Sequence, residues 1–164
     1  MKKVILGLAM LMFAVMNSQA MAAAPKVPKS LCLDFDSFSD YHILGIKLSN
    51  TVKSADGPVK LFEIVGHAFG LANHPIHGTG YIVPGANTFH STYTGAGRSG
   101  SVNVNRIWEV FFDLSTNTGS IFSHFDFGDG SKFSANGTGI TGVACNSLPI
   151  AGIVVGEPEP FQGE

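Results

Sequence analysis

The segment RIWEVFFDLSTNTGSIFSHFDF, residues 106–127, predicts a β-hairpin and decides the fold class. Two runs rich in Ile, Val, Phe and Trp flank the turn sequence STNT, residues 115–118. With STNT as a four-residue loop, Leu114 faces Gly119, and alternate residues of both strands point to the same side. That side is mainly apolar, and it consists of Trp108, Val110, Phe112, Leu114, Ile121 and Phe125. The hairpin therefore has a core face, as in an antiparallel sheet with one side buried.

The other face of this hairpin mixes aromatic and polar side chains. Phe111 and Phe122 alternate there with acidic residues and with His124. The same register places Glu109 opposite His124, a surface pair that contributes about 0.2 to 1 kcal/mol. We expect this face to be a solvated exterior or a contact surface.

Similar strand patterns follow one another along the chain, and no segment predicts a helix. Each is rich in Val, Ile, Phe, Tyr or Thr and is bounded by Gly, Pro, Asn, Asp or Ser. Short connections favour antiparallel neighbours over parallel crossovers. The predicted strands are residues 31–38, 41–48, 59–70, 76–83, 88–94, 106–114, 120–127 and 139–145.

About eight strands in a meander predict an all-β protein built as an antiparallel up-and-down barrel, with a β-sandwich as the alternative. This architecture resembles lipocalin-like barrels. The likeness is one of architecture alone, since the chain has no G-x-W near the predicted mature N-terminus.

The N-terminus predicts a signal peptide over residues 1–22. Lys2 and Lys3 precede an apolar run over residues 4–16, and Ala20-Met21-Ala22 is a small-residue cleavage site. The run has about 13 residues, whereas a membrane-spanning helix needs about 20. We therefore expect a soluble, exported protein without a membrane span in its mature form, located in a periplasm or outside the cell.

The mature chain is predicted to contain one domain. A linker over residues 23–30 precedes a barrel domain over 31–155, and a tail over 156–164 follows. Loss of Lys2 and Lys3 leaves eight basic residues against twelve acidic ones, a net charge of about −4. This balance excludes an electrostatic footprint for nucleic acid and a polybasic patch for anionic lipid.

Two cysteines remain after removal of the signal peptide, Cys32 and Cys145. In an oxidising compartment such a pair most simply forms one disulfide. The alternative is two free thiols, one of them a nucleophile.

The segment GHAFGLANHPIHGTGY, residues 66–81, contains His67, His74 and His77. With LANHP as a loop, Phe69 faces His77 and His67 faces Thr79, so that His67 and His77 share a face and His74 lies in the loop. With PGAN as the next turn, Tyr81 faces His90. The three histidines are candidate ligands for a metal, which needs nitrogens about 2 Å from a zinc ion. The competing hypothesis is a face of His, Thr and Tyr that meets water or lines a polar lumen.

One further motif is present only as a literal match. GAGRSG, residues 95–100, has the G-x-G-x-x-G spacing of a dinucleotide-binding turn, but a strand pattern follows where a helix is required. We interpret it as a flexible loop, and no cofactor is predicted.

Three classes of function are compatible with these patterns. The first is non-catalytic binding of a small apolar or amphipathic ligand inside the barrel. The second is an envelope or extracellular protein-interaction module, or a self-associating one, that uses the face of Phe111 and Phe122. The third is a histidine-based metal binder or enzyme. The residues predicted to line a barrel ligand site are Phe35, Phe62, Phe69, Trp108, Phe112 and Phe125.

Overall fold

The computed structural model describes residues 26–35, 40–70 and 73–148, and within them the chain forms eight β-strands and one short 3-10 helix. The predicted all-β fold is confirmed. Residues 1–22, the predicted signal peptide, lie outside the described part, as do residues 149–155 of the predicted domain and the tail. The strands are β1 (Ser30–Phe35), β2 (Asp40–Ser54), β3 (Gly57–Phe69), β4 (His74–Ile82), β5 (Thr88–Ser99), β6 (Val102–Asp113), β7 (Thr118–Phe127) and β8 (Lys132–Val143), and the helix is η1 (Cys145–Ser147).

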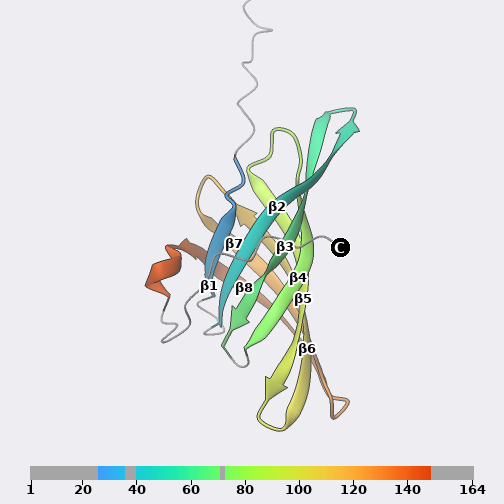
Figure 1. Cartoon of the computed structure of the whole chain (residues 1–164), viewed down its shortest axis with the longest axis vertical. Coiled ribbons are helices and arrows are strands. Elements are labelled where there is room, and N and C mark those ends of the chain that lie inside the picture. Colours follow the sequence, from blue (N-terminus) through green and yellow to red (C-terminus); the bar gives the residue numbers. More distant parts are fainter. Residues whose placement is uncertain (1–25, 36–39, 71–72, 149–164) are drawn as a thin grey trace, which may run out of the picture.

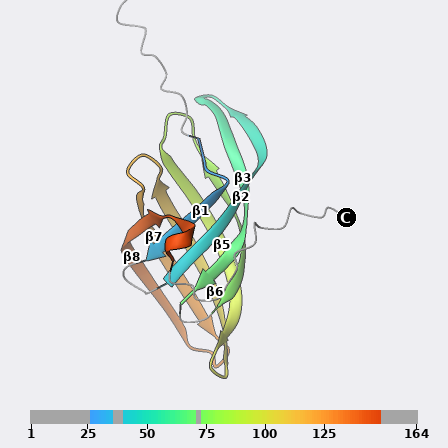
Figure 2. The same cartoon turned by 60° about the vertical axis from the view of Figure 1, so that its left-hand side comes forward.

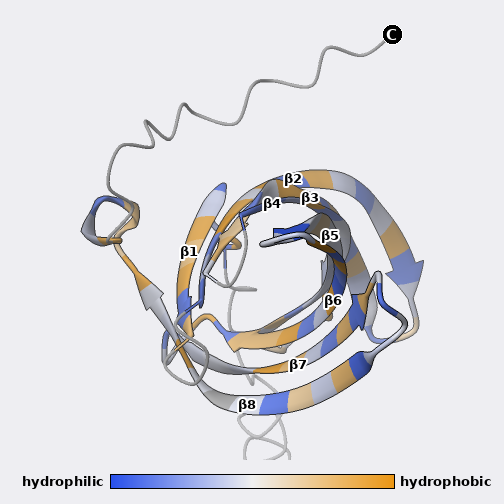
Figure 3. Ribbon diagram, turned by 90° about the horizontal axis from the view of Figure 1, so that it is seen from below, coloured by the Kyte–Doolittle hydropathy of each residue, from blue (hydrophilic) through white to orange (hydrophobic). Residues whose placement is uncertain are grey.

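The strands close into an up-and-down barrel, as predicted. Each strand pairs antiparallel with the next one along the chain (Figure 1). The ring closes where β1 pairs with β8, with Cys32 opposite Val143 and Phe35 opposite Ile140. Figure 3 shows this ring from one end, with hydrophobic and hydrophilic residues alternating along the strands. Closure gives every strand two partners and therefore leaves no sheet edge.

The core of the barrel is filled by the inward-facing residues of this alternation. On β6 the even-numbered residues from Val104 to Phe112 are buried, whereas the odd-numbered ones from Asn103 to Phe111 are exposed. The apolar core face predicted for the hairpin of β6 and β7 is confirmed, with Leu114 packed at its margin. An eight-stranded barrel has an interior just wide enough for side chains to fill.

Two hairpin registers differ from the predicted ones. Phe112, and not Leu114, faces Gly119, because Asp113 begins the turn by accepting hydrogen bonds from the backbone amides of Ser115 and Thr116. The residue opposite Gly119 is two positions earlier in β6 than predicted, and because this shift is even, each side chain stays on its predicted face. Glu109 therefore lies opposite Phe122 and not opposite His124, which bonds instead to Ser134 through Nδ1 and Oγ, 2.7 Å apart.

The second corrected register is that of β3 and β4. His77 faces Val65 and His67 faces Pro75, because the strand begins at His74, a residue predicted to lie in the loop. The predicted pairing of Tyr81 with His90 across β4 and β5 is confirmed.

Three segments that lie outside the predicted strands belong to strands of the barrel. Residues 49–54 of β2 are all exposed and still pair with β3 as far as Gly57. GAGRSG, interpreted as a flexible loop, continues β5 to Ser99, and its chain reverses at Gly100, where φ is +60°. Residues 132–138 extend β8. The backbone hydrogen bonds of a hairpin form without an apolar face, so a search for alternating apolar residues does not detect these polar strand segments.

The two ends of the domain are fastened to the barrel wall. In the predicted linker, the carbonyl of Lys29 accepts a 2.7 Å hydrogen bond from the amide of Ile46, and Val27 packs against the core. The predicted disulfide between Cys32 and Cys145 is formed and ties η1 to β1. Leu148, just after η1, packs with Cys32 and Ile43 on the outer wall, where Figure 2 shows η1 beside β1.

Within the described residues, no helix is long and apolar enough to cross a membrane.

We predict that replacing both cysteines by serine lowers the free energy of unfolding by about 2–5 kcal/mol, because the bridge closes a loop of 113 residues in the unfolded chain. Urea denaturation of the variant and of the oxidised protein measures the difference. Equal midpoints would show that the bridge does not constrain the unfolded chain.

Candidate functional site: a buried polar cluster inside the barrel

A cluster of polar side chains lies inside the barrel, which otherwise contains mainly apolar residues. Its members come from four strands that the chain brings together only by closing the ring. Each member is at most 3% exposed. The cluster consists of Asp40 and His42 on β2, His74 on β4, Tyr93 on β5, and Arg106 and Trp108 on β6.

The alternation of each strand directs these side chains inward. Arg106 has the same parity as Trp108 and Val110, and His74 has the same parity as Ile76. Glycines make room beside them. A Cβ at Gly97 would collide with the His74 ring, and one at Gly70 would collide with the Asp40 carboxylate. Small residues on β5 and after β3 therefore accommodate the polar side chains.

Arg106 and Asp40 form the ion pair of the cluster. A guanidinium Nη2 of Arg106 donates to a carboxylate oxygen of Asp40. The guanidinium carbon also lies 4.3 Å from the centre of the Phe125 ring and 4.8 Å from that of Trp108. Burying a charge is costly unless it is paired, so this ion pair is what allows an arginine inside the barrel.

Trp108 is the centre of the cluster. Its ring lies 4.9 Å from that of His42, 5.5 Å from that of Tyr93 and 6.1 Å from that of His74. His42 Nδ1 and the Tyr93 hydroxyl are hydrogen-bonded at 2.7 Å. These contacts fix the rings against one another, so the polar atoms that they carry are held in defined positions.

Several donors of the cluster have no hydrogen-bond partner among the described residues. They are Nε and Nη1 of Arg106, Nε1 of Trp108 and Nε2 of His42, and the two ring nitrogens of His74 are likewise without a partner. When Tyr93 donates to Nδ1 of a neutral His42, the ring proton is on Nε2, which is then a donor as well. An unsatisfied buried polar group costs about 1–3 kcal/mol, so each of these donors calls for an acceptor, either a water molecule or an atom of a bound molecule.

Burial keeps the two histidines neutral. It lowers the pKa of His42 well below the usual value, and the nearby Arg106 charge and His74 lower it further. Burial and then Arg106 also lower the pKa of His74, against smaller opposing effects of the Ala96 backbone and of Asp40. Burial raises the pKa of the Tyr93 hydroxyl well above its usual value, so this hydroxyl keeps its proton. The cluster as a whole then carries one positive and one negative charge.

An aromatic path leads from this cluster to the surface. Phe125 covers the Arg106 guanidinium, and its ring centre is 5.6 Å from that of Phe133 on β8. Phe133 faces Phe125 directly in the ladder and is 55% exposed. The path reaches the end of the barrel at which β2, β4, β6 and β8 begin.

The residues predicted to line a ligand site are not all in one place. Five of them, Phe35, Phe62, Trp108, Phe112 and Phe125, are buried inside the barrel. Phe69 lies on the outer wall instead, half-buried beside the cluster of Cys32, Ile43 and Leu148. Residue 69 has the opposite parity to Ala68, which is fully buried. Of the five inside, Trp108 belongs to the polar cluster, Phe125 contacts Arg106, and the centre of the Phe35 ring lies 4.2 Å from that of His42.

The structure does not bring the imidazoles of the predicted metal site together. His67 and His77 are exposed on the outer wall, whereas His74, opposite Ala68, is fully buried inside. The barrel wall therefore separates His74 from the other two. In the described part of the chain, no group of three or more His, Cys, Asp or Glu side chains is placed to hold a metal ion.

The two phenylalanines that the sequence suggests for protein contacts lie on the outer side of β6 and β7. Phe111 is 42% exposed and lies opposite Ser120, while Phe122 is half-buried opposite Glu109. The two rings are thus diagonal to each other and belong to different rungs of the ladder.

Sequence reasoning alone misses most members of the polar cluster. Arg106 stands at the first position of a predicted strand, although its parity with Trp108 already directs it inward. Asp40, His42 and Tyr93 belong to no motif. The sequence pattern that could have revealed them is a polar residue at an inward position of an otherwise apolar strand face. His42 is an example, because it alternates in step with Leu44 and Ile46.

No family model, curated protein or solved structure matches this chain.

We predict that Arg106→Met lowers the free energy of unfolding by about 3–5 kcal/mol, because it leaves the Asp40 carboxylate buried without its cation. The double variant Asp40→Asn with Arg106→Met is expected to lose much less than the sum of the two single variants. Urea denaturation of all four proteins gives the coupling energy, and strictly additive losses would contradict a coupled pair.

We also predict that stability falls as the pH drops below about 6.5, the ordinary pKa of histidine. The unfolded chain takes up protons there at a higher pH than folded His42 and His74 do, since the pKa values of the folded histidines are lowered. The unfolded state thus binds more protons, and each histidine contributes a slope of up to about 1.4 kcal/mol per pH unit.

The double variant His42→Phe with Tyr93→Phe removes one of these groups without leaving an unpaired hydroxyl, and it is expected to reduce the slope between about pH 6.5 and 5. His77→Gln, on the exposed outer wall, is the matched control. A slope that is the same in both variants would place the titrating group elsewhere.

Proposed function

We propose that this protein is an exported, non-catalytic binding protein whose barrel takes one small, uncharged amphipathic molecule. The molecule's carbonyl or hydroxyl oxygen accepts hydrogen bonds from Arg106 and Trp108, and its apolar part lies along Phe125 and Phe133. The observation that carries this proposal is the set of buried donors without partners on Arg106, Trp108 and His42.

The donors favour an oxygen acceptor as the ligand's polar group. Arg106 offers Nε and Nη1, and Trp108 offers Nε1, from neighbouring side chains whose ring and guanidinium are in contact. A carbonyl oxygen has two lone pairs and can accept from two such donors at once. Ligand sites of this type are mostly apolar, with a few placed polar groups that fix the orientation.

The charge balance favours an uncharged ligand. Arg106 is already neutralised by Asp40, and burial holds both histidines neutral. A carboxylate ligand would add a second anion to a buried site with a single cation, and it would have to bring a proton with it. An ester, ketone or alcohol brings the same oxygen acceptor without that cost.

The aromatic path accounts for the apolar part of the ligand. Phe133 is the most exposed of the large hydrophobic residues that the structure describes, and its ring is adjacent to that of Phe125. An exposed ring that continues into the barrel suits the tail of an amphipathic molecule. Its position next to Arg106, by way of Phe125, links the apolar and polar halves of the site.

Export is supported by the N-terminal pattern and by the disulfide. A cysteine pair that bridges the two ends of the barrel domain fits an oxidising compartment. The periplasm and the extracellular space both meet this condition.

The experiment uses Trp108, the single tryptophan of the chain, as the reporter. Three probes share a ten-carbon chain, namely methyl decanoate, decanoate and decane. We expect methyl decanoate to change the Trp108 fluorescence saturably and to bind more tightly than decanoate at neutral pH and than decane. Absence of any saturable change, or equal binding of decane and the ester, would overturn the proposal.

Two variants test the named contacts. Arg106→Lys keeps a cation beside Asp40 but removes the Nε and Nη1 donors of the guanidinium. Phe133→Ser removes the exposed ring. Each is expected to weaken ester binding by about tenfold, the equivalent of about 1.4 kcal/mol. Ile107→Ser, on the exposed outer side of the same strand as Arg106, is the control and is expected to bind like the wild type.

A further inference from the structure

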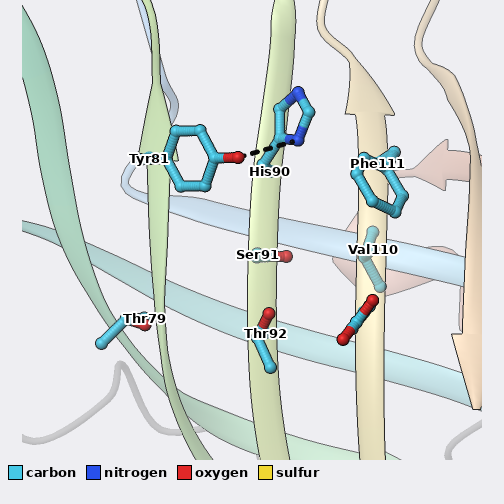
Figure 4. A pocket seen from close by; sticks show the side chains of 8 residues that line it. Thr79, Tyr81, His90, Ser91, Thr92, Val110 and Phe111 are labelled. Carbon is cyan, nitrogen blue, oxygen red and sulfur yellow. Dashed lines mark hydrogen bonds between the residues drawn. The ribbon is translucent and has the colours of Figure 1, made fainter.

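A hollow of about 230 Å³ lies on the outer wall of the barrel, over β4, β5 and β6 (Figure 4). It is separate from the polar cluster, because its functional side chains point outward from the same strands. The residues around it are Thr79, Tyr81, His90, Ser91, Thr92, Glu109, Val110 and Phe111.

The strand registers arrange its outward side chains in two rungs. Tyr81, His90 and Phe111 are direct neighbours across the three strands and form an aromatic rung. Thr79, Thr92 and Glu109 form a second rung, two residues further along each strand. Neighbouring strands lie about 4.8 Å apart and two residues span about 6.6 Å, so the two rungs border one small area.

The aromatic rung is held in a fixed shape by its own contacts. The rings of Tyr81 and His90 are 4.9 Å apart with planes only 22° from parallel, and the Tyr81 hydroxyl lies 3.4 Å from His90 Nδ1. Figure 4 shows the Tyr81 ring face-on, with its hydroxyl directed at His90. Phe111 stands nearly perpendicular to His90, at 82° and 4.8 Å. Tyr81 and His90 thus form a platform, and Phe111 forms a wall beside it.

The packing of the core does not account for these rings. Tyr81 and Phe111 are each 42% exposed on the outer side of the wall, while their chain neighbours Ile82 and Val110 are buried inside the barrel. Exposed aromatic residues gathered over a hollow mark a binding surface more often than scattered apolar residues do.

We infer that this hollow binds one ring of an uncharged sugar. A pyranose ring has an apolar face of C–H groups and an edge of hydroxyl groups. The C–H face matches the Tyr81 and His90 platform. The hydroxyl edge matches the Thr79 and Thr92 hydroxyls and the Glu109 carboxylate, which accepts hydrogen bonds from hydroxyl groups.

The size and shape of the hollow favour a single sugar ring over the other ligands of aromatic sites. A volume of 230 Å³ lies below the range of about 300–1,000 Å³ that is usual for drug-sized ligands. A quaternary ammonium is bound by several ring faces that surround it. This hollow has aromatic rings on two sides only, the platform of Tyr81 and His90 and the wall of Phe111, and threonine hydroxyls border its remaining side.

The experiment is saturation-transfer NMR on the full mature protein with a panel of methyl glycosides, those of glucose, galactose, mannose and N-acetylglucosamine. We expect at least one to receive saturation, strongest on the C–H protons of one ring face. Choline is titrated in parallel. Failure of every glycoside at its highest soluble concentration would overturn the inference, as would choline binding without glycoside binding.

Four variants locate and characterise the site. Tyr81→Ala and Phe111→Ala are expected to weaken glycoside binding by about tenfold or more, the equivalent of about 1.4 kcal/mol or more. Glu109→Gln keeps an acceptor oxygen, so glycoside binding is expected to persist, whereas a cation site would be lost. Ile107→Ala, at 41% exposure on the same face of β6 but outside the hollow, is the control and is expected to bind like the wild type.

Two further measurements distinguish a sugar site from the site inside the barrel and from a self-association surface. Tyr81→Ala is expected to leave the Trp108 fluorescence response to methyl decanoate unchanged, since Trp108 is fully buried inside the barrel. Sedimentation of the wild type is expected to show no association that Phe111→Ala abolishes. Such association would make the hollow a contact between copies of the chain and would overturn the inference.

Discussion

The buried ion pair between Arg106 and Asp40 is the constraint on which the interior of this barrel depends. A guanidinium in an eight-stranded barrel has no access to bulk water, so a carboxylate has to lie beside it. Asp40 is the first residue of β2 and Arg106 lies on β6, which are neighbours only across the barrel interior. The pair thus joins opposite walls. Burial lowers the pKa of both nearby histidines, and the positive charge of Arg106 lowers it further.

The interior is divided into two parts with different roles. One part is apolar and tightly filled, with Ile64, Phe89 and Phe112 fully or almost fully buried. This part supplies the hydrophobic stabilisation, and the disulfide outside the barrel adds a covalent link between η1 and β1. The other part retains polar groups that are costly to bury. Because the barrel could be filled by apolar side chains throughout, the donors near Trp108 are a feature that stability does not require.

Much of the fold follows from sequence periodicity. The strand alternation and the short turns predict the barrel, and the apolar face of Trp108, Val110 and Phe112 predicts its core. The register of the hairpins is harder to predict than the strands. A turn begins where a side chain such as that of Asp113 accepts a hydrogen bond from the backbone, and the hydropathy pattern does not show which of several neighbouring residues does so. The polar cluster is hard to predict because residue chemistry and strand parity point to different places for the same side chain. The chemistry of His74 and Arg106 suggests a loop or a surface position, whereas parity with Ile76 and Trp108 determines which way they face.

The central claim is that Arg106 and Trp108 donate to an oxygen of an uncharged ligand. Trp108 is the single tryptophan, so its indole N–H gives one resonance in a proton–nitrogen correlation spectrum. Titration with methyl decanoate tests this contact at both donors. We expect the indole resonance to move saturably downfield, as it does when an indole gains an acceptor, and the Arg106 Nε–H resonance to move with it. An unchanged indole resonance, with shifts confined to residues of the outer wall, would contradict donation by Trp108 to the ligand.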